Sequence, residues 1–245
     1  MKKQVRFTSW SWSRYADYRQ CALKAKLAHL DKIREPKNPA MERGAALHDH
    51  IRDVIRGVKG VKLADLGFNK VANGWIQAYQ KLMKRKTLQP IIEDDWAFRA
   101  DWTQTQWNDW AECVLRVKLD AAHFEEEGDV LIINDWKSGK FRPEMNSEYI
   151  EQLELYSLAG LVLYPQVREV RPRLAYVDFG IIYPPPSEPI VFTQTDVPKL
   201  KKLWAKRTKA MLSDTTFAPR ANDKCKWCFY GQSGKAKGGP GLCKF

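Results

Sequence analysis

A carboxylate and an ammonium group stand two residues apart at the end of an apolar segment. Residues 130–133 read Val-Leu-Ile-Ile, which predicts a buried strand, and the acid Asp135 and the base Lys137 follow. Because side chains alternate along a strand, these two point to the same face. A carboxylate can hold a divalent cation, while an ammonium group offsets charge on a phosphate or helps to deprotonate water. The pair indicates metal-assisted phosphodiester hydrolysis, although a surface ion pair would give the same pattern.

A second carboxylate, Asp120, lies at the end of the preceding predicted strand. Residues 125–128 supply a turn between the two strands, so Asp120 and Asp135 can lie near each other. Two carboxylates that share a buried position are costly unless a cation neutralises them. The alternative is that Asp120 faces solvent.

Two further residues, His48 and Glu93, have suitable chemistry for such a site. His48 borders the apolar stripe of a predicted helix, and Glu93 opens a run of three acids. An imidazole nitrogen and a carboxylate oxygen are both common metal ligands. Taken alone, they have a simpler interpretation as a packed histidine and the solvated start of a strand.

Gln152 and Tyr156 form another candidate pair. They are four residues apart, so they share one face of a predicted helix. The amide can orient a water, a metal ligand or a phosphate, and the phenol can stack on a base or donate a hydrogen bond. Partial burial on an amphipathic helix is the alternative explanation.

The order of these residues resembles that of the RecB-like branch of the PD-(D/E)XK nuclease superfamily, over about residues 8 to 245. The resemblance implies an α/β core with a mixed central sheet flanked by helices, and a histidine and two acids that bind one or two Mg or Mn ions. The matching motifs are Gly44-x3-His48, Glu93, Asp120, Asp135-x-Lys137 and Gln152-x3-Tyr156.

This resemblance also assigns roles to individual residues. The metal would be held by His48, Asp120, Asp135 and the backbone carbonyl of Trp136. Lysine is catalytic in the family, and the Gln-x3-Tyr helix flanks the site. The implied catalytic residues are Asp120, Asp135, Lys137, Gln152 and Tyr156.

Five cysteines suggest a second metal site. Cys225 and Cys228 have a chelating spacing, and Cys243 adds a third thiolate from the same loop. We expect Cys21 to be the fourth ligand and Cys113 to be a buried core thiol. The arrangement resembles the 4Fe-4S site of the CRISPR-associated RecB-like exonuclease, which would join the two ends of the chain. A structural zinc ion would use the same spacing.

Composition narrows the choice of partner and compartment. The 245 residues are 44% hydrophobic, and the formal net charge is +12, which favours a polyanionic partner. No apolar run is long enough to span a membrane, so nucleic acid is the better candidate than a membrane surface. The first residues lack the apolar core of a secretory signal, and we therefore expect a cytoplasmic protein, or one in the host cytoplasm if it is viral.

Periodicity predicts a single nuclease domain over residues 1–245. It would comprise an N-terminal helix carrying Cys21 (1–35), helices and the nuclease core (36–213) and a cysteine-bearing tail (214–245). Expected helices span 9–27, 39–58, 68–83, 146–164 and 196–212, and expected strands span 91–99, 113–122, 130–137, 174–183 and 189–193.

From this sequence we expect a metal-dependent exonuclease that acts on DNA with a free end. It would serve recombination, repair or viral DNA processing, with recombination or replication proteins as partners. Two alternatives stay open: a basic nucleic-acid-binding module with a structural metal cluster, and a structure-specific endonuclease.

Overall fold

A mixed β-sheet forms the centre of the protein, which is represented by a computed structural model that describes residues 5–142 and 146–245. In the described residues the sheet has seven strands in the order β2-β1-β3-β4-β5-β6, and β7 also pairs with β5. Among the strands of the described residues, β4 and β5 are the one parallel pair. The strands are β1 (Ile91–Phe98), β2 (Gln104–Thr105), β3 (Leu115–Glu125), β4 (Val130–Lys137), β5 (Glu169–Tyr176), β6 (Ile181–Tyr183) and β7 (Phe192–Thr193).

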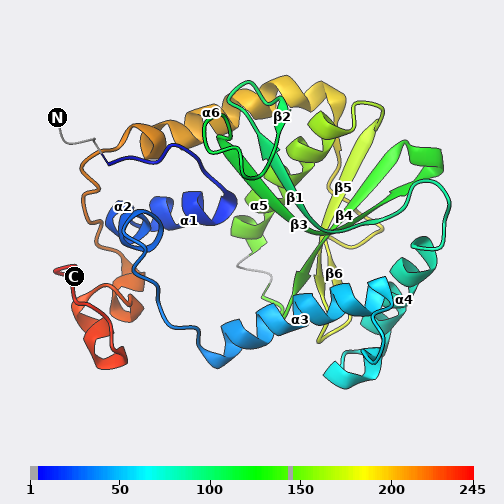
Figure 1. Cartoon of the computed structure of the whole chain (residues 1–245), viewed down its shortest axis with the longest axis horizontal. Coiled ribbons are helices and arrows are strands. Elements are labelled where there is room, and N and C mark those ends of the chain that lie inside the picture. Colours follow the sequence, from blue (N-terminus) through cyan, green and yellow to red (C-terminus); the bar gives the residue numbers. More distant parts are fainter. Residues whose placement is uncertain (1–4, 143–145) are drawn as a thin grey trace.

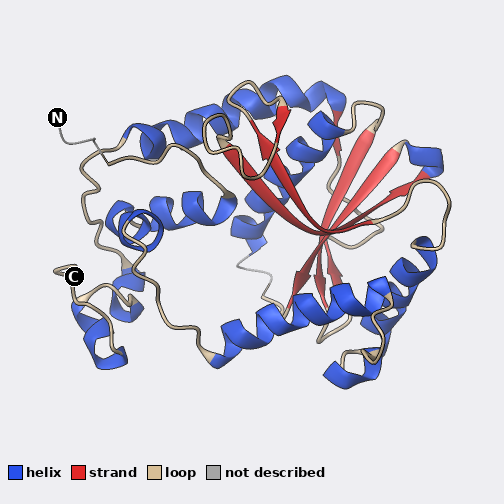
Figure 2. Ribbon diagram, in the orientation of Figure 1, coloured by secondary structure: helices blue, strands red, loops and turns tan. Residues whose placement is uncertain are grey.

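Helices cover both faces of this sheet (Figures 1 and 2). α3 and α4 pack over one face, while α1, α5 and α6 share the larger core on the other. The mixed sheet with flanking helices is the predicted fold class. The helices are α1 (Trp12–Gln20), α2 (Ala22–Ala25), a π-helical turn (Lys26–Leu30), α3 (Pro39–Arg56), α4 (Lys70–Leu82), α5 (Asn146–Leu163) and α6 (Val197–Ser213). None of the described helices combines the length and the apolarity that spanning a bilayer requires.

Side-chain caps fix where three of these helices begin. Ser11, Asn38 and Asn69 each accept a hydrogen bond from a backbone N–H in the first turn of α1, α3 and α4. Pro39 occupies the first turn of α3, where its missing N–H costs nothing, as the sequence predicts. α3 ends at Gly57, whose φ of +71° suits glycine.

The segment β4-α5-β5 positions the predicted motif. Parallel neighbours need a crossover, and α5 supplies it. The second half of α5 is largely apolar and is buried throughout residues 155–161, because it packs between the sheet and α6. The C-terminal end of β4, which carries Asp135 and Lys137, therefore faces the first turns of α5.

Two predictions of secondary structure were wrong, and one short strand was not predicted. The expected helix 9–27 is interrupted at Cys21, which has an extended backbone (φ −162°, ψ 121°) and separates α1 from α2. The expected strand 174–183 is two strands, β5 and β6, joined by a turn that contains Gly180 at φ +66°. The short strand β2 was not predicted, because two polar residues carry no periodicity.

The two ends of the described chain pack against each other, as Figure 1 shows at its left side. Phe229 and Tyr230 in the tail form a small core with Leu27, and the Tyr230 hydroxyl donates a 2.8 Å hydrogen bond to the carbonyl of Ile33. The tail itself contains two short 3-10 turns (Asp223–Trp227 and Gln232–Lys237).

Candidate active site

The alternation of side chains changes phase at Glu93 on β1 and at Asp120 on β3. Val117 and Leu119 belong to the core beneath α5 and α6, but beyond Asp120 the residue on that face is Ala122. The backbone pairing skips the same place: Ile92 pairs with Ala121 and Asp94 with Leu119.

Glu93 itself has φ +48°, a left-handed conformation that is costly for a residue with a Cβ atom. The phase change frees the side chains of Glu93 and Asp120 from the regular alternation. As a result, both carboxylates turn toward α3.

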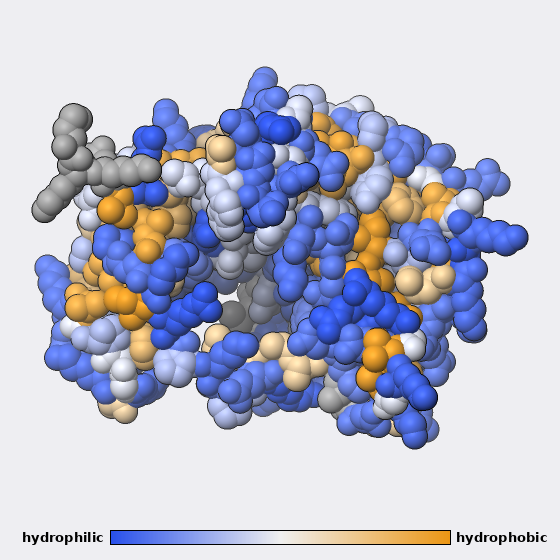
Figure 3. All heavy atoms as spheres, viewed as in Figure 1, coloured by the Kyte–Doolittle hydropathy of each residue, from blue (hydrophilic) through white to orange (hydrophobic). Residues whose placement is uncertain are grey.

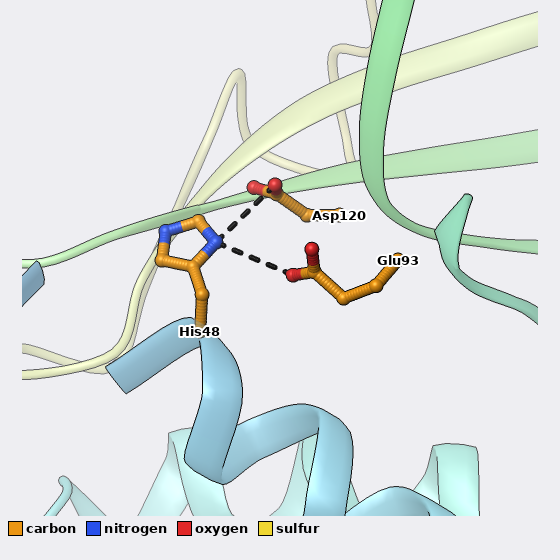
Figure 4. A group of neighbouring side chains, drawn as sticks. All are labelled: His48, Glu93 and Asp120. Carbon is orange, nitrogen blue, oxygen red and sulfur yellow. Dashed lines mark ion pairs between the residues drawn. The ribbon is translucent and has the colours of Figure 1, made fainter. Parts of the chain in front are cut away.

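His48 on α3 meets these two carboxylates (Figure 4). Its Nδ1 lies 3.2 Å from Asp120 Oδ1 and 3.5 Å from Glu93 Oε1. Potential ligand atoms of the three residues all lie within 4.8 Å of one another. Gly44, one turn earlier, allows α3 to approach the loop after β4, because a Cβ atom there would lie 3.3 Å from Ser138 Oγ.

The two carboxylates dominate the electrostatics of His48. Burial alone would lower its pKa, but the contacts with Asp120 and Glu93 and the charge of Asp135 raise the pKa of His48 to about 10. In addition, Glu93 Oε1 is shielded from solvent and accepts no hydrogen bond from the described residues. The pocket therefore attracts positive charge, and a divalent cation fits its donor set of one imidazole and two carboxylates.

Asp135 and Lys137 form an ion pair at the end of β4. Asp135 is buried, and burial together with the charge of Asp120 raises its pKa to about 6, against the opposing effect of Lys137. Burial would lower the pKa of Lys137, but the charge of Asp135 raises it. The Lys137 ammonium also lies 4.6 Å from the centre of the Tyr149 ring on α5. Lys137 is thus a positioned cation.

Trp136 contacts Asp120 through its backbone N–H, which donates a 2.9 Å hydrogen bond to Asp120 Oδ2. The sequence-based expectation concerned the carbonyl of Trp136 as a metal ligand, and that role stays a prediction. The Trp136 side chain packs in the core beneath α3 and α4.

Gln152 and Tyr156 are both buried and bonded to each other. Gln152 Nε2 donates a 2.7 Å hydrogen bond to the Tyr156 hydroxyl. Burial and the charges of Asp135 and Asp120 raise the pKa of Tyr156 well above its ordinary value. The pair borders the acidic residues and lines a cavity that also contains Lys118. Lys118 Nζ lies 3.5 Å from Glu93 Oε2, so it belongs to the same neighbourhood.

The four cysteines of the predicted second site line one small cavity with Tyr230 and Phe245. Backbone N–H groups of Arg220 and Asn222 donate to the sulfurs of Cys21 and Cys225, at 3.4 and 3.3 Å. Within the described residues, however, no three of the sulfurs lie within 4.8 Å of one another, so they do not form a compact ligand set. Cys113 is buried elsewhere in the core, as predicted.

Glu93 is not among the predicted metal ligands, but the structure brings it to His48 and Asp120. Its signal was a carboxylate directly after the apolar pair Ile91-Ile92. Lys118 was missed, because a lysine in an alternating strand reads as a solvent-exposed residue.

The surface of the molecule is hollowed at the centre of the face shown in Figure 3, and hydrophilic residues form most of the rim.

The sequence profile described as the PD-(D/E)XK nuclease superfamily matches residues 9–233. No curated protein sequence matches the chain significantly. The crystal structure of SSO0001 is 11% identical, with a TM-score of 0.39 over 94% of this chain and 87% of that one. A protein of Eubacterium rectale, provisionally named an exonuclease, is 10% identical, with a TM-score of 0.45 over 90% of this chain and 86% of its own.

Proposed function

The chain belongs to the PD-(D/E)XK nuclease superfamily, and on that basis we propose that it is a metal-dependent exonuclease of the RecB-like branch that degrades DNA from a free end. One observation carries the proposal: His48, Glu93 and Asp120, from three different elements, bring ligand atoms within 4.8 Å of one another. The ion pair of Asp135 and Lys137 borders this group.

A divalent ion would be held by His48, Glu93 and Asp120, with Asp135 and the Trp136 carbonyl as further ligands. Carboxylates suit Mg and Mn, and the single imidazole favours Mn over the oxygen-seeking Mg. When bound, the ion supplies Lewis acidity toward the scissile phosphate and lowers the pKa of an attacking water.

The protein's own groups would position the substrate. Lys137 presents an ammonium group held by Asp135 and Tyr149, and it would offset the charge that builds on the phosphate. Gln152 and Tyr156 would hold the reacting nucleotide through an amide and a hydroxyl that are already fixed to each other. The net charge of +12 favours the polyanionic substrate.

The test is digestion of end-labelled linear DNA in Mn, with and without EDTA. We expect wild-type protein to release short products from the ends, and Asp120→Asn to lose roughly a thousandfold in rate. Asp49→Asn is the matched control, since that carboxylate lies one residue from His48 but is exposed and paired with Arg52. Equal digestion by Asp120→Asn, or digestion unaffected by EDTA, would contradict the proposal.

Closed circular DNA distinguishes the mode of attack. An exonuclease leaves closed circular single strands intact while it degrades the same sequence once it is linear. Cleavage of both at one rate would instead favour a structure-specific endonuclease. Exonuclease activity would suit cytoplasmic DNA recombination, repair or viral DNA processing, in company with recombination or replication proteins.

We also propose that Cys21, Cys225, Cys228 and Cys243 hold a 4Fe-4S cluster. The shared cavity and the N–H groups directed at two of the sulfurs support it. A tetrahedral zinc ion would need sulfurs roughly 3.8 Å apart, given Zn–S bonds of about 2.3 Å. A cluster binds each thiolate at a different iron and so spans a wider set of ligands.

A further inference from the structure

Two guanidinium groups share one hydroxyl beside the candidate active site. Ser9 Oγ accepts a 2.8 Å hydrogen bond from Arg14 Nη1 and a 3.0 Å hydrogen bond from Arg116 Nη1. Within the described residues neither arginine forms an ion pair with a carboxylate. Burial and the charge of Arg116 lower the pKa of Arg14, as expected for two neighbouring cations.

The N-terminal segment creates this pair by running along β3. Trp10 N–H donates to the carbonyl of Val114 at 2.7 Å, and Arg116 N–H donates to the carbonyl of Trp10 at 2.9 Å. This pairing brings Ser9 beside Arg116. Arg14 on α1 and Arg116 on β3 lie about a hundred residues apart in the sequence, so this pairing is what brings them together.

Arg116 is fixed and yet incompletely bonded. It is 7% exposed, its Nε donates to the carbonyl of Trp107 at 3.0 Å, and its guanidinium lies 4.6 Å from the centre of the Trp110 ring. Its Nη2 is shielded from solvent and has no hydrogen-bond partner among the residues that the structure describes. A buried guanidinium N–H without an acceptor is costly, so the group is suited to an incoming anion.

The arginines line a cavity of about 400 Å³, a size that takes a small organic ligand. Half-buried rings of Trp12 and Trp107 form part of the wall. The same cavity is lined by Lys118, Gln152 and Tyr156, which border the candidate metal ligands. The cavity therefore borders the proposed active site, and the contact of Lys118 with Glu93 links the two.

We propose that this cavity binds one nucleotide of single-stranded DNA beside the scissile phosphate. Arg14 and Arg116 hold a backbone phosphate, whose oxygens suit the planar forks of two guanidinium groups. The base stacks on the ring of Trp12 or Trp107, which requires an unpaired base because a duplex keeps its bases stacked on one another. The assignment to DNA rests on the proposed function, and it makes Arg14 and Arg116 positioning residues for a single strand.

Binding can be measured without cleavage, by anisotropy of a fluorescently labelled oligothymidylate in EDTA. Arg14→Gln loses a charged contact to phosphate, so we expect it to bind the oligonucleotide about tenfold more weakly. It should also reduce the slope of log affinity against log salt by about 0.7, the value for one phosphate contact of a single strand. The control is Arg168→Gln, which removes the same charge from an exposed side chain directly before β5, outside the lining of the cavity.

A second variant guards against misfolding. Arg116→Lys keeps the buried charge but loses the fork, and we expect it to weaken binding by about tenfold as well. Wild-type affinity and salt slope in both variants, or a wild-type protein that does not bind the oligonucleotide, would overturn the proposal. The binding assay contains EDTA and therefore no free metal. A lack of nuclease activity in Mn would refute the proposed function without affecting the result of the binding assay.

Discussion

Trp136 orients Asp120: its backbone N–H donates a 2.9 Å hydrogen bond to Asp120 Oδ2, and the other oxygen, Oδ1, lies 3.2 Å from His48. β4, which carries Asp135 and Lys137, thus fixes the Asp120 carboxylate of the neighbouring strand β3 through a backbone N–H. One oxygen of Asp120 is held, and the other is presented to the pocket.

Replacement of Glu93 should separate its chemical role from its backbone strain. Its φ of +48° costs a residue with a Cβ atom of the order of 1 kcal/mol, but costs glycine little. We expect Glu93→Gly and Glu93→Ala to lose nuclease activity equally, while the glycine variant unfolds with a free energy about 1 kcal/mol higher than the alanine variant. Urea unfolding of both proteins measures the difference, and equal stabilities would argue against strain at this position.

The metal-free protein should lose stability at alkaline pH through His48. Its pKa is about 10 in the folded protein against 6.5 in a free side chain, so the folded state keeps a proton that the unfolded chain has released. The free energy of unfolding therefore falls as the pH rises from 6.5 to about 10, by roughly 2 kcal/mol or more. Urea unfolding in EDTA at both ends of this range tests it. The decline should be much smaller in His48→Gln, and a decline of the same size there would assign it to another group.

Lys137 should matter for the reaction rather than for metal binding. Lys137→Met removes the cation beside the phosphate, and we expect the rate to fall by about 10² to 10⁴ while Mn affinity stays within a few-fold of wild type. Lys209→Met, which removes an exposed lysine from α6, serves as the control. The measurement is single-turnover digestion with calorimetric titration of Mn in parallel. Equal losses of digestion rate and Mn affinity in Lys137→Met would make Lys137 a structural partner of Asp135 instead.

The cysteine cavity should bind iron. Protein purified without oxygen should be coloured and contain about four iron atoms per chain, as a 4Fe-4S cluster requires. Cys225→Ser should lose the iron, and Cys113→Ser should keep it, because Cys113 lies in the core away from the cavity. Colourless protein that contains zinc would show that the sulfurs close around a single ion.

Much of this architecture follows from local sequence. β4 covers the predicted residues 130–137, because its apolar run and the turn after it are both local signals. The start of α3 at Pro39 follows from its cap, Asn38. The proximity of Asp120 and Asp135 also follows from the hairpin between their strands. In each case the physical cause lies within a few residues of its effect.

Other parts depend on contacts that the sequence does not display. The turn of Glu93 toward His48 requires a left-handed backbone and a phase change on two strands, and neither has a signature in residue type. Arg14 and Arg116 were not expected to meet, because the pairing of Trp10 with β3 joins distant segments. The extended backbone at Cys21 likewise reflects its packing against the tail.

The most direct test of the central claim is calorimetric titration of Mn into the metal-free protein. We expect wild-type protein and Asp49→Asn to bind with the same affinity, and Asp120→Asn to bind at least about tenfold more weakly, since it loses a charged ligand that β4 has already oriented. Binding of Mn by Asp120→Asn with wild-type affinity would contradict the account.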